Sequence, residues 1–329
     1  MGTETTTSER EFFGVPNADG YVPVLLETLR IDSIPDFDLY NRVGKEYILY
    51  RRGKHPFTEE HRRALVENGV RALYVPEKEI GRYWDYLKEN VSVILSDPQL
   101  PPQRKAEVFH ASAIGLTRNV FATRGSEEAL KTAGEVVKGS AQLLLEGRQG
   151  FHAFLQMVGT DANFYSHAVN VCTYGIALAR DLGLPHDQLA ELGTGLLLHD
   201  LGMIGVPPET VKKAQSLTSQ EWEPIYAHPE RGLIMYEEGG GKSDIAKAVI
   251  LNHHERMDGS GYPRGLLGPE IPLVGRIAGV VDVFDALTTE RPYRPALSTF
   301  QALVCMKRDL RAGLDQDLVQ RLIRILGPA

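Results

Sequence analysis

Two aspartates, Asp282 and Asp285, interrupt the segment 280–287, in which every other residue is apolar. A spacing of three residues places both carboxylates on neighbouring parts of one helix face. An unpaired carboxylate is costly to bury in an apolar core, so a fold that packs this helix inside must bring positive groups against it. Groups of that kind therefore have to converge on this helix from elsewhere in the chain.

Histidine is the residue type that gathers before this helix. Six of the ten histidines fall within residues 167–254. Any one of them, taken alone, is better explained as a core histidine with ordinary hydrogen-bond partners. Two consecutive histidines at the end of a core helix are harder to satisfy without a metal ion. Five of the six lie on or at the end of a helix with a strong apolar pattern: His167, His199, His228, His253 and His254.

The positions of these histidines on their predicted helices favour a shared site. His167 lies on the apolar face of a helix predicted over 161–183. His199 and Asp200 end an apolar stretch, and such a pair can bind one ion and bridge to a second. His228 is predicted to lie in a helix that begins with a capping box at Thr218, and the following Pro229 is expected to break or kink that helix.

The combined set is a group of imidazole and carboxylate ligands without a thiolate. Such ligands suit first-row ions such as iron, manganese or zinc. Because the set is larger than one catalytic ion requires, we expect two ions. A pair of metal ions about 3.5–4 Å apart suits phosphoester hydrolysis, in which a bridging hydroxide attacks phosphorus.

A Gly/Pro-rich loop, residues 258–265, follows the double histidine. Its Tyr262 supplies a ring and a hydroxyl group, and Arg264 is a candidate bidentate partner for a phosphate. Arg291 and Arg294 form a second cationic pair after Asp282. These arginines would supply local positive charge in a chain whose net charge is −7, a value that argues against broad binding to nucleic-acid polymers or anionic membranes.

The chain reads as a multidomain protein. Residues 1–97 are predicted to form a small α+β module, residues 98–157 a helical connector, and residues 158–329 an all-helical bundle. Strands are predicted over 21–26, 46–50 and 72–75, with a helix beginning at Thr58. No apolar run is long enough for a membrane span, and the N-terminus does not resemble a signal peptide, so we expect a cytoplasmic protein.

Several stretches together resemble the HD-GYP family of the HD phosphohydrolase superfamily. The similarity covers about residues 160–329 and implies an all-helical HD-GYP bundle. It also implies hydrolysis of the bacterial second messenger cyclic di-GMP to pGpG, and in some members on to GMP. The matching stretches are His199-Asp200-Leu201-Gly202, His253-His254-Glu255, Asp258-Gly259-Ser260-Gly261-Tyr262-Pro263, residues 277–287, and Arg291-Pro292-Tyr293-Arg294.

The resemblance assigns roles residue by residue. Asp200 would bridge two divalent ions and act with His199 in catalysis. Gly261, Tyr262 and Pro263 would form the loop beside the substrate, with Arg291 and Arg294 facing its phosphates. Such domains usually follow a sensory or regulatory module, and signalling protein partners and a homodimer are compatible with the family. The implied metal ligands are His167, His199, Asp200, His228, His253, His254 and Asp282.

Two departures from the family pattern leave alternatives open. Asn163 stands where some members have a glutamate that helps to hold a third ion, so two ions are expected here. Met203 stands where the family usually has lysine, so a phosphate contact is missing. A nucleotide sensor that does not cut its ligand, and a hydrolase acting on another cyclic dinucleotide, are therefore the alternatives.

Overall fold

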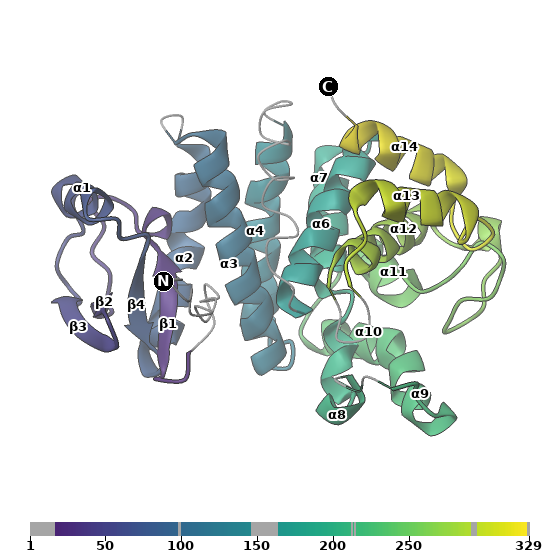
Figure 1. The fold of residues 1–329 in the computed structure, drawn as a ribbon, viewed down its shortest axis with the longest axis horizontal. Coiled ribbons are helices and arrows are strands. Elements are labelled where there is room, and N and C mark those ends of the chain that lie inside the picture. Colours follow the sequence, from purple (N-terminus) through teal and green to yellow (C-terminus); the bar gives the residue numbers. More distant parts are fainter. Residues whose placement is uncertain are drawn as a thin grey trace, which may run out of the picture. The chain divides into compact units, whose positions relative to one another are not determined.

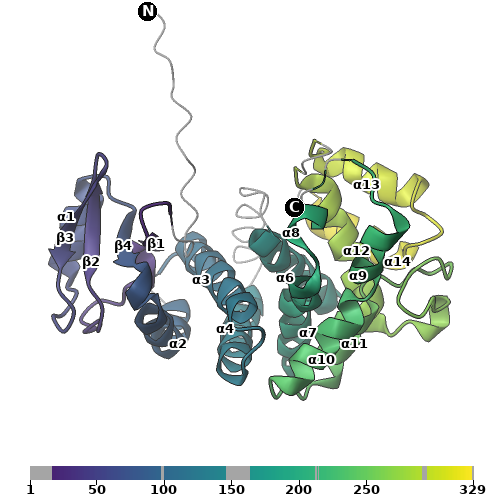
Figure 2. The ribbon, with the colours of Figure 1, turned by 90° about the horizontal axis from the view of Figure 1, so that it is seen from below.

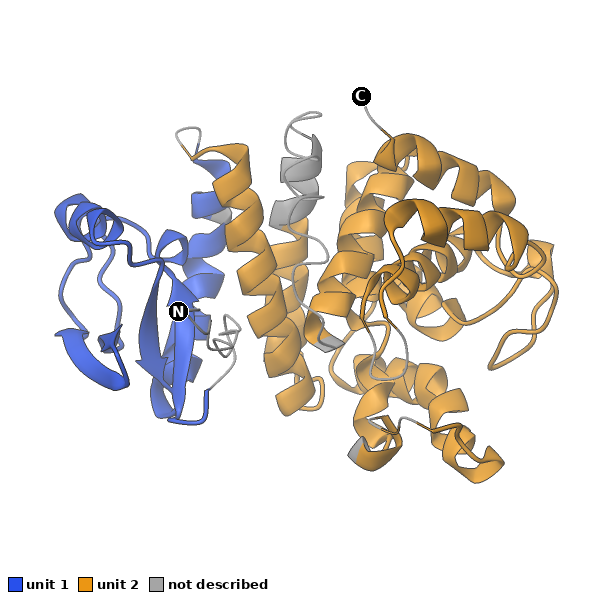
Figure 3. Ribbon diagram, in the orientation of Figure 1, with its two compact units in different colours: residues 1–97 blue, residues 98–329 orange. Residues whose placement is uncertain are grey.

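The structure is a computed structural model that describes residues 17–97, 100–145, 164–211, 213, 215–290 and 295–327. The chain divides into two compact units, residues 1–97 and residues 98–329 (Figure 3). The first unit contains a small antiparallel sheet and the second is built of helices (Figure 1). The predicted order, an α+β module followed by an all-helical region, is confirmed.

The sheet of the first unit has four antiparallel strands in the order β1-β4-β2-β3. Valines that alternate along β1, Val22 and Val24, are buried against the rest of this unit. The sequence predicted three of these strands and missed β2, in which only Leu39 is buried. The strands are β1 (Tyr21–Leu25), β2 (Leu39–Val43), β3 (Glu46–Arg51) and β4 (Ala72–Pro76).

Two α-helices complete the first unit. Helix α1 (Glu59–Glu67) begins with a capping box in which Thr58 is the N-cap, as predicted, and His61 is its partner. Helix α2 (Ile80–Ser96) contacts strand β4 and buries Leu87 completely.

In the described part of the second unit, helices are the regular secondary structure and no strand is present. The bounds are α3 (Pro102–Ala122), α4 (Glu127–Leu145), α6 (Phe164–Asp181), α7 (His186–Leu198), α8 (Pro208–Val211), α9 (Ser219–Tyr226), α10 (His228–Glu238), α11 (Asp244–Asn252), α12 (Leu273–Thr288), α13 (Thr299–Arg308) and α14 (Gln316–Leu326).

Four helices form the centre of this unit. Helix α7 packs against α6 and α11, and α12 packs against the same two helices (Figure 1 and Figure 2). Leucines on α7, including Leu192 and Leu196, are fully buried at these contacts. With α10, which packs on α11, these helices carry all the predicted metal ligands, so the apolar core holds the site in place.

The segment predicted as a connector packs onto this centre. Helix α3 contacts α4 and α6, and α4 contacts α7. The contacts follow from an apolar face on α3, where Val108, Phe109 and Leu116 are buried. Its described helices thus belong to the second compact unit. No helix among the described residues combines the length and hydropathy needed to span a bilayer.

Candidate metal centre

Helix ends place most of the predicted ligands. His199 is the C-cap of α7 and is followed by Asp200, and His253 is the C-cap of α11 and is followed by His254. His228 is the first residue of α10. The remaining two, His167 and Asp282, lie within α6 and α12. Side chains that leave a helix at its end can approach one another without a helix backbone between them.

The helix break predicted at Pro229 is present, but His228 belongs to the new helix and not to the one that begins after Thr218. Helix α9 ends before His228, at Tyr226, and Pro229 lies in the first turn of the new helix α10. Proline is accepted there because the N–H groups of a first turn have no partner within the helix. The capping box of Thr218 and Glu221 was correctly predicted and begins α9.

A close backbone contact brings two of these helix ends together. A Cβ atom added to Gly202 would lie only 2.0 Å from the carbonyl oxygen of His228. Only glycine permits this approach, because any side chain would overlap with the backbone of α10. Gly202 therefore allows Asp200, two residues earlier, to reach His228.

All seven predicted ligands come together, in two groups whose ligand atoms lie within 4.8 Å of one another. We call them the seven-residue cluster. The first group is Asp200, His228, His253 and His254, and the second is His167, His199 and Asp282.

The two carboxylates link these groups. Asp200 Oδ1 lies 3.2 Å from His228 Nε2, while its Oδ2 lies 3.4 Å from His199 Nε2 in the other group. Asp282 does the same, with Oδ1 3.3 Å from His167 Nε2 and Oδ2 3.7 Å from His254 Nδ1. Each carboxylate therefore faces both groups.

Backbone carbonyls fix three of the imidazoles. The Nδ1 atoms of His199, His228 and His253 lie 2.7, 2.6 and 2.9 Å from the carbonyl oxygen three residues earlier. A carbonyl oxygen only accepts, so each Nδ1 must carry the hydrogen and donate it. In the neutral imidazoles the Nε2 atoms then present lone pairs to the cluster.

These lone pairs lack hydrogen-bond donors. The Nε2 atoms of His228 and His253 lie 3.1 Å apart, and His199 Nε2 is a buried atom without a hydrogen-bond partner in the described chain. Acceptors that face acceptors are stabilised by a cation between them. The nitrogen and oxygen donors, oriented and without hydrogens of their own, thus fit divalent first-row metal ions.

The cluster holds both charged and neutral imidazoles. Although burial opposes it, the neighbouring carboxylates raise the pKa of His199 and raise that of His167 to about 10, so an ion bound by these two histidines would displace their protons. Although burial opposes it, the neighbouring His199 and His228 hold the pKa of Asp200 well below its ordinary value, so this carboxylate stays ionised. Burial, together with the surrounding imidazoles, lowers the pKa of His253 far below its usual range. Burial also lowers the pKa of His254, to about 3. These two histidines therefore remain neutral and able to bind a cation.

A second layer orients His167. Its Nδ1 lies 2.7 Å from Asp285 Oδ2, and the other carboxylate oxygen accepts a hydrogen bond of 2.9 Å from Asn170 Nδ2. The positive groups expected opposite the two aspartates of α12 are thus mainly histidines. Sequence reasoning predicted that Asp285 needs a positive partner, but it did not single out Asn170.

Five of the seven cluster residues, all but His199 and His253, line a cavity of about 690 Å³. Its lining comes partly from α12 and partly from residues 210, 211, 213, 215–217, 222 and 225. Met203 lines this cavity, as do two cations that sequence reasoning did not single out, Lys213 and Arg256. Lys213 Nζ lies 2.7 Å from both carboxylate oxygens of Glu221.

The Gly/Pro-rich loop packs directly on the double histidine. A Cβ atom on Gly261 would lie 2.3 Å from the backbone nitrogen of Arg256, so the close approach requires glycine. The Tyr262 ring lies beside His254, with centroids 4.6 Å apart. Burial, and then the carboxylates of Asp200 and Asp282, raise the pKa of Tyr262, which keeps its phenol protonated.

Glu255 holds this loop in place. Its carboxylate is buried and accepts hydrogen bonds from the backbone N–H groups of Arg264, at 2.8 Å, and Leu266, at 2.9 Å. The guanidinium group of Arg264 donates to Asn252 Oδ1 at 2.5 Å, and Arg264 does not line the cavity. The structure thus gives Arg264 a contact within the protein, and Glu255 a positioning role that the sequence did not reveal.

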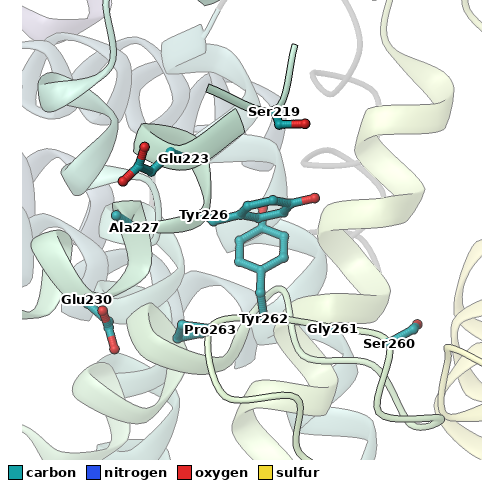
Figure 4. A pocket seen from close by; sticks show the side chains of 9 residues that line it. All are labelled: Ser219, Glu223, Tyr226, Ala227, Glu230, Ser260, Gly261, Tyr262 and Pro263. Carbon is teal, nitrogen blue, oxygen red and sulfur yellow. The ribbon is translucent and has the colours of Figure 1, made fainter. Parts of the chain in front are cut away.

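A second pocket, of about 660 Å³, is lined by the same loop (Figure 4). Gly261, Tyr262 and Pro263 line it together with Tyr226. Tyr262 therefore borders both pockets. The predicted substrate residues Arg291 and Arg294, and also Asn163, lie outside the described residues.

Comparison with known proteins places this geometry in a family. Residues 158–318 match the HD domain. This part of the chain belongs to the HD-domain family. The match runs from just before α6 to α14 and includes every member of the seven-residue cluster. The predicted membership of the HD phosphohydrolase superfamily, with its HD-GYP motifs, is confirmed.

The HD-domain chain is similar to curated phosphodiesterases. It is 33% identical to the cyclic di-GMP phosphodiesterase PA4108 of Pseudomonas aeruginosa over 226 residues, which cover 68% of this chain and 54% of that protein. It is 36% identical to the 3'3'-cGAMP-specific phosphodiesterase 3 of Vibrio cholerae over 161 residues, 49% of this chain and 35% of that protein. The chain thus spans about half or less of these relatives.

A solved structure shares the fold over most of the chain. Bd1817, an HDG"Y"P protein from Bdellovibrio bacteriovorus, superimposes with a TM-score of 0.68 at 24% sequence identity. The alignment covers 93% of this chain and 99% of that one. The likeness extends the shared fold beyond the HD domain into the first unit.

Proposed function

We propose that this chain is a metal-dependent phosphodiesterase that hydrolyses cyclic di-GMP to pGpG. The observation that carries the proposal is the seven-residue cluster, in which the Nε2 lone pairs of His199, His228 and His253 face ionised carboxylates inside a cavity. The cyclic di-GMP phosphodiesterases among its relatives support the same reaction.

Two divalent ions would be held by the two groups of the cluster. Such ions supply an activated water and neutralise the charge that develops on a phosphodiester. Asp200 and Asp282 face both groups and would keep the two ions adjacent. Asp200 and His199 are the residues we assign to catalysis, and iron is the metal we propose, ahead of manganese and zinc.

The chain's own residues bind and orient the substrate. Tyr262, kept protonated, presents a phenol hydroxyl beside His254, and Gly261 and Pro263 hold the ring there. Arg256 lines the cavity and supplies positive charge next to the cluster. We further propose that Arg291 and Arg294 bind the phosphates, whereas Arg264 acts through Asn252 on the loop.

Residues 1–97 are proposed as a sensory or regulatory module and residues 98–157 as its connector to the HD domain. The separate compact fold of residues 1–97 supports this division. The cytoplasmic location, the signalling protein partners and the homodimer remain predictions.

Substrate choice and catalysis are tested together. Protein purified without oxygen is analysed for metal content and assayed with cyclic di-GMP, 3'3'-cGAMP and cyclic di-AMP. We expect two ions per chain, product from cyclic di-GMP, and loss of turnover in Asp200→Asn. Asp187→Asn, an exposed aspartate at the start of α7, is the matched control. Absence of bound metal or unchanged turnover in Asp200→Asn would contradict the proposal, and preference for 3'3'-cGAMP would change the substrate.

A further inference from the structure

Two large aromatic side chains on α9 remain exposed beside the cavity. Trp222 and Tyr226 keep 38% and 48% of their surface exposed. Their rings lie one helical turn apart and stack, with centroids 5.4 Å apart and planes 20° from parallel. Aromatic side chains of this size usually gain stability by burial. Two that stay exposed next to a candidate active site therefore suggest a ligand.

The rings continue a row that starts at the seven-residue cluster. The Tyr262 ring lies 4.6 Å from the ring of His254 and 4.8 Å from that of Tyr226. Tyr226 in turn stacks on Trp222. Figure 4 shows Tyr226 and Tyr262 meeting at the boundary of the second pocket. The row leads from a predicted metal ligand to Trp222.

Trp222 faces the same cavity as the cluster. It lines that cavity with two apolar neighbours, Leu217 and Ile225. Val283 and Leu287 on α12 add further apolar lining, and Asp282 of the cluster lines the same cavity. Beside a phosphodiester held at the cluster, the cavity thus offers a flat aromatic surface and apolar walls. A purine base has the flat, polarisable face that fits this surface.

We propose that the indole ring of Trp222 is a stacking platform for a purine base of the substrate. The proposal rests on the proposed function and extends it by assigning a base-binding residue. Tyr226, stacked on the indole, keeps that ring in position. Because stacking accepts any purine, Trp222 would strengthen binding of guanine and adenine alike.

Fluorescence tests the contact directly, because the chain has only two tryptophans. Trp84, buried in the first unit, is replaced by phenylalanine, so that Trp222 is the remaining fluorophore. The metal-loaded Trp84→Phe protein is titrated with a phosphorothioate analogue of cyclic di-GMP that resists hydrolysis. We expect saturable quenching, with the same Kd as calorimetry gives. Binding by calorimetry without any change in fluorescence would overturn the proposal.

The kinetics of Trp222 variants measure how much base stacking contributes to substrate binding. In Trp222→Ala we expect KM for cyclic di-GMP to rise by roughly 5- to 150-fold, the range for loss of one base-stacking contact, with Trp222→Phe in between. Turnover of methyl p-nitrophenyl phosphate, a small phosphodiester without a base, should change much less. Phe300→Ala, which removes an aromatic ring that is 76% exposed on α13, is the matched control and should behave as wild type.

The outcomes separate this proposal from the proposed function. Wild-type turnover of cyclic di-GMP with an unchanged KM in Trp222→Ala would overturn the stacking platform alone. A wild-type protein that cuts the small phosphodiester but neither binds nor cuts any cyclic dinucleotide would overturn both. Equal loss of activity on both substrates in Trp222→Ala, without rescue by Trp222→Phe, would indicate a structural role and also overturn the platform.

Discussion

His228 and His253 point their Nε2 atoms at each other across 3.1 Å, while their Nδ1 hydrogens are both donated to backbone carbonyl oxygens. The two nitrogens are acceptors without a hydrogen between them, so the contact is unfavourable until a cation or a proton enters. The pair therefore links metal binding to the stability of the helix ends that carry it.

Metal binding should raise thermal stability. Adding Mn²⁺ to chelator-treated protein at about 100 times its Kd contributes roughly 2.7 kcal/mol, which corresponds to a rise in Tm of roughly 5 to 10 °C for a unit of this size. Calorimetry of wild type and His253→Gln measures the shift. His186→Gln, a histidine outside the cluster, should keep it, and an equal shift in His253→Gln would count against the metal centre.

Asp285 should act on metal affinity through His167. Asp285→Asn keeps the size of the side chain but removes the charge that holds His167 Nδ1–H. We expect Mn²⁺ to bind roughly 10- to 100-fold more weakly, as measured by competition with a fluorescent chelator. Asp309→Asn, an exposed residue paired with Arg308, serves as control. Unchanged affinity in Asp285→Asn would show that the second layer does not orient the ligand.

Glu255 should affect substrate binding without affecting metal content. Glu255→Gln replaces one acceptor oxygen by an NH₂ group, so the N–H of Arg264 or Leu266 loses its partner. A loss of about 1.5–3 kcal/mol corresponds to a KM raised by roughly 10- to 100-fold. Glu270→Gln removes a similar but exposed contact to Leu267 and should have a smaller effect. Loss of metal in Glu255→Gln would contradict this separation.

Met203 should limit substrate affinity. Met203→Lys adds an ammonium group to the cavity wall, and a gain of about 1 kcal/mol would lower KM by roughly fivefold. Steady-state kinetics of this variant and of Met203→Leu, which keeps the wall apolar, make the comparison. An unchanged KM in Met203→Lys would show that Lys213 and Arg256 already supply the charge the substrate needs.

His110 on α3 should make stability depend on pH. Burial lowers its pKa to about 4, despite a hydrogen bond with Asn170. Between pH 6.5 and pH 4 the unfolded chain therefore binds the extra proton, and stability falls as the pH falls. Between pH 8 and pH 5, His110 should lower the free energy of unfolding of the wild type by about 2 kcal/mol. In His110→Leu this contribution should be absent, and urea unfolding at the two pH values measures the difference. The same pH dependence in the variant would assign the effect to other groups.

The residue types of the cluster were predictable because they are expensive in an apolar core. Asp282, on a largely apolar helix, and the double histidine at 253–254 each need polar partners when buried. In the structure Asp282 contacts His254 and also His167. Glu255 gave no such signal, because its two partners are backbone N–H groups that no sequence pattern displays.

The missed strand has a comparable explanation. In β2, Asn41 and Arg42 separate Leu39 from Val43, so the alternation of apolar residues is weak. The strand forms because β4 and β3 lie on either side of it and satisfy its backbone. The place of Lys213 in the cavity lining could not be predicted either. Lys213 lies in the segment between α8 and α9, and local periodicity does not predict the path of a loop.

The carbonyl contacts of His199 and His253 make the last turns of α7 and α11 intolerant of changes in length. One inserted residue would rotate the imidazole by about 100° around the helix axis and separate its Nδ1 from the oxygen three positions back. Natural variants of this protein should accordingly keep a constant number of residues in these two turns.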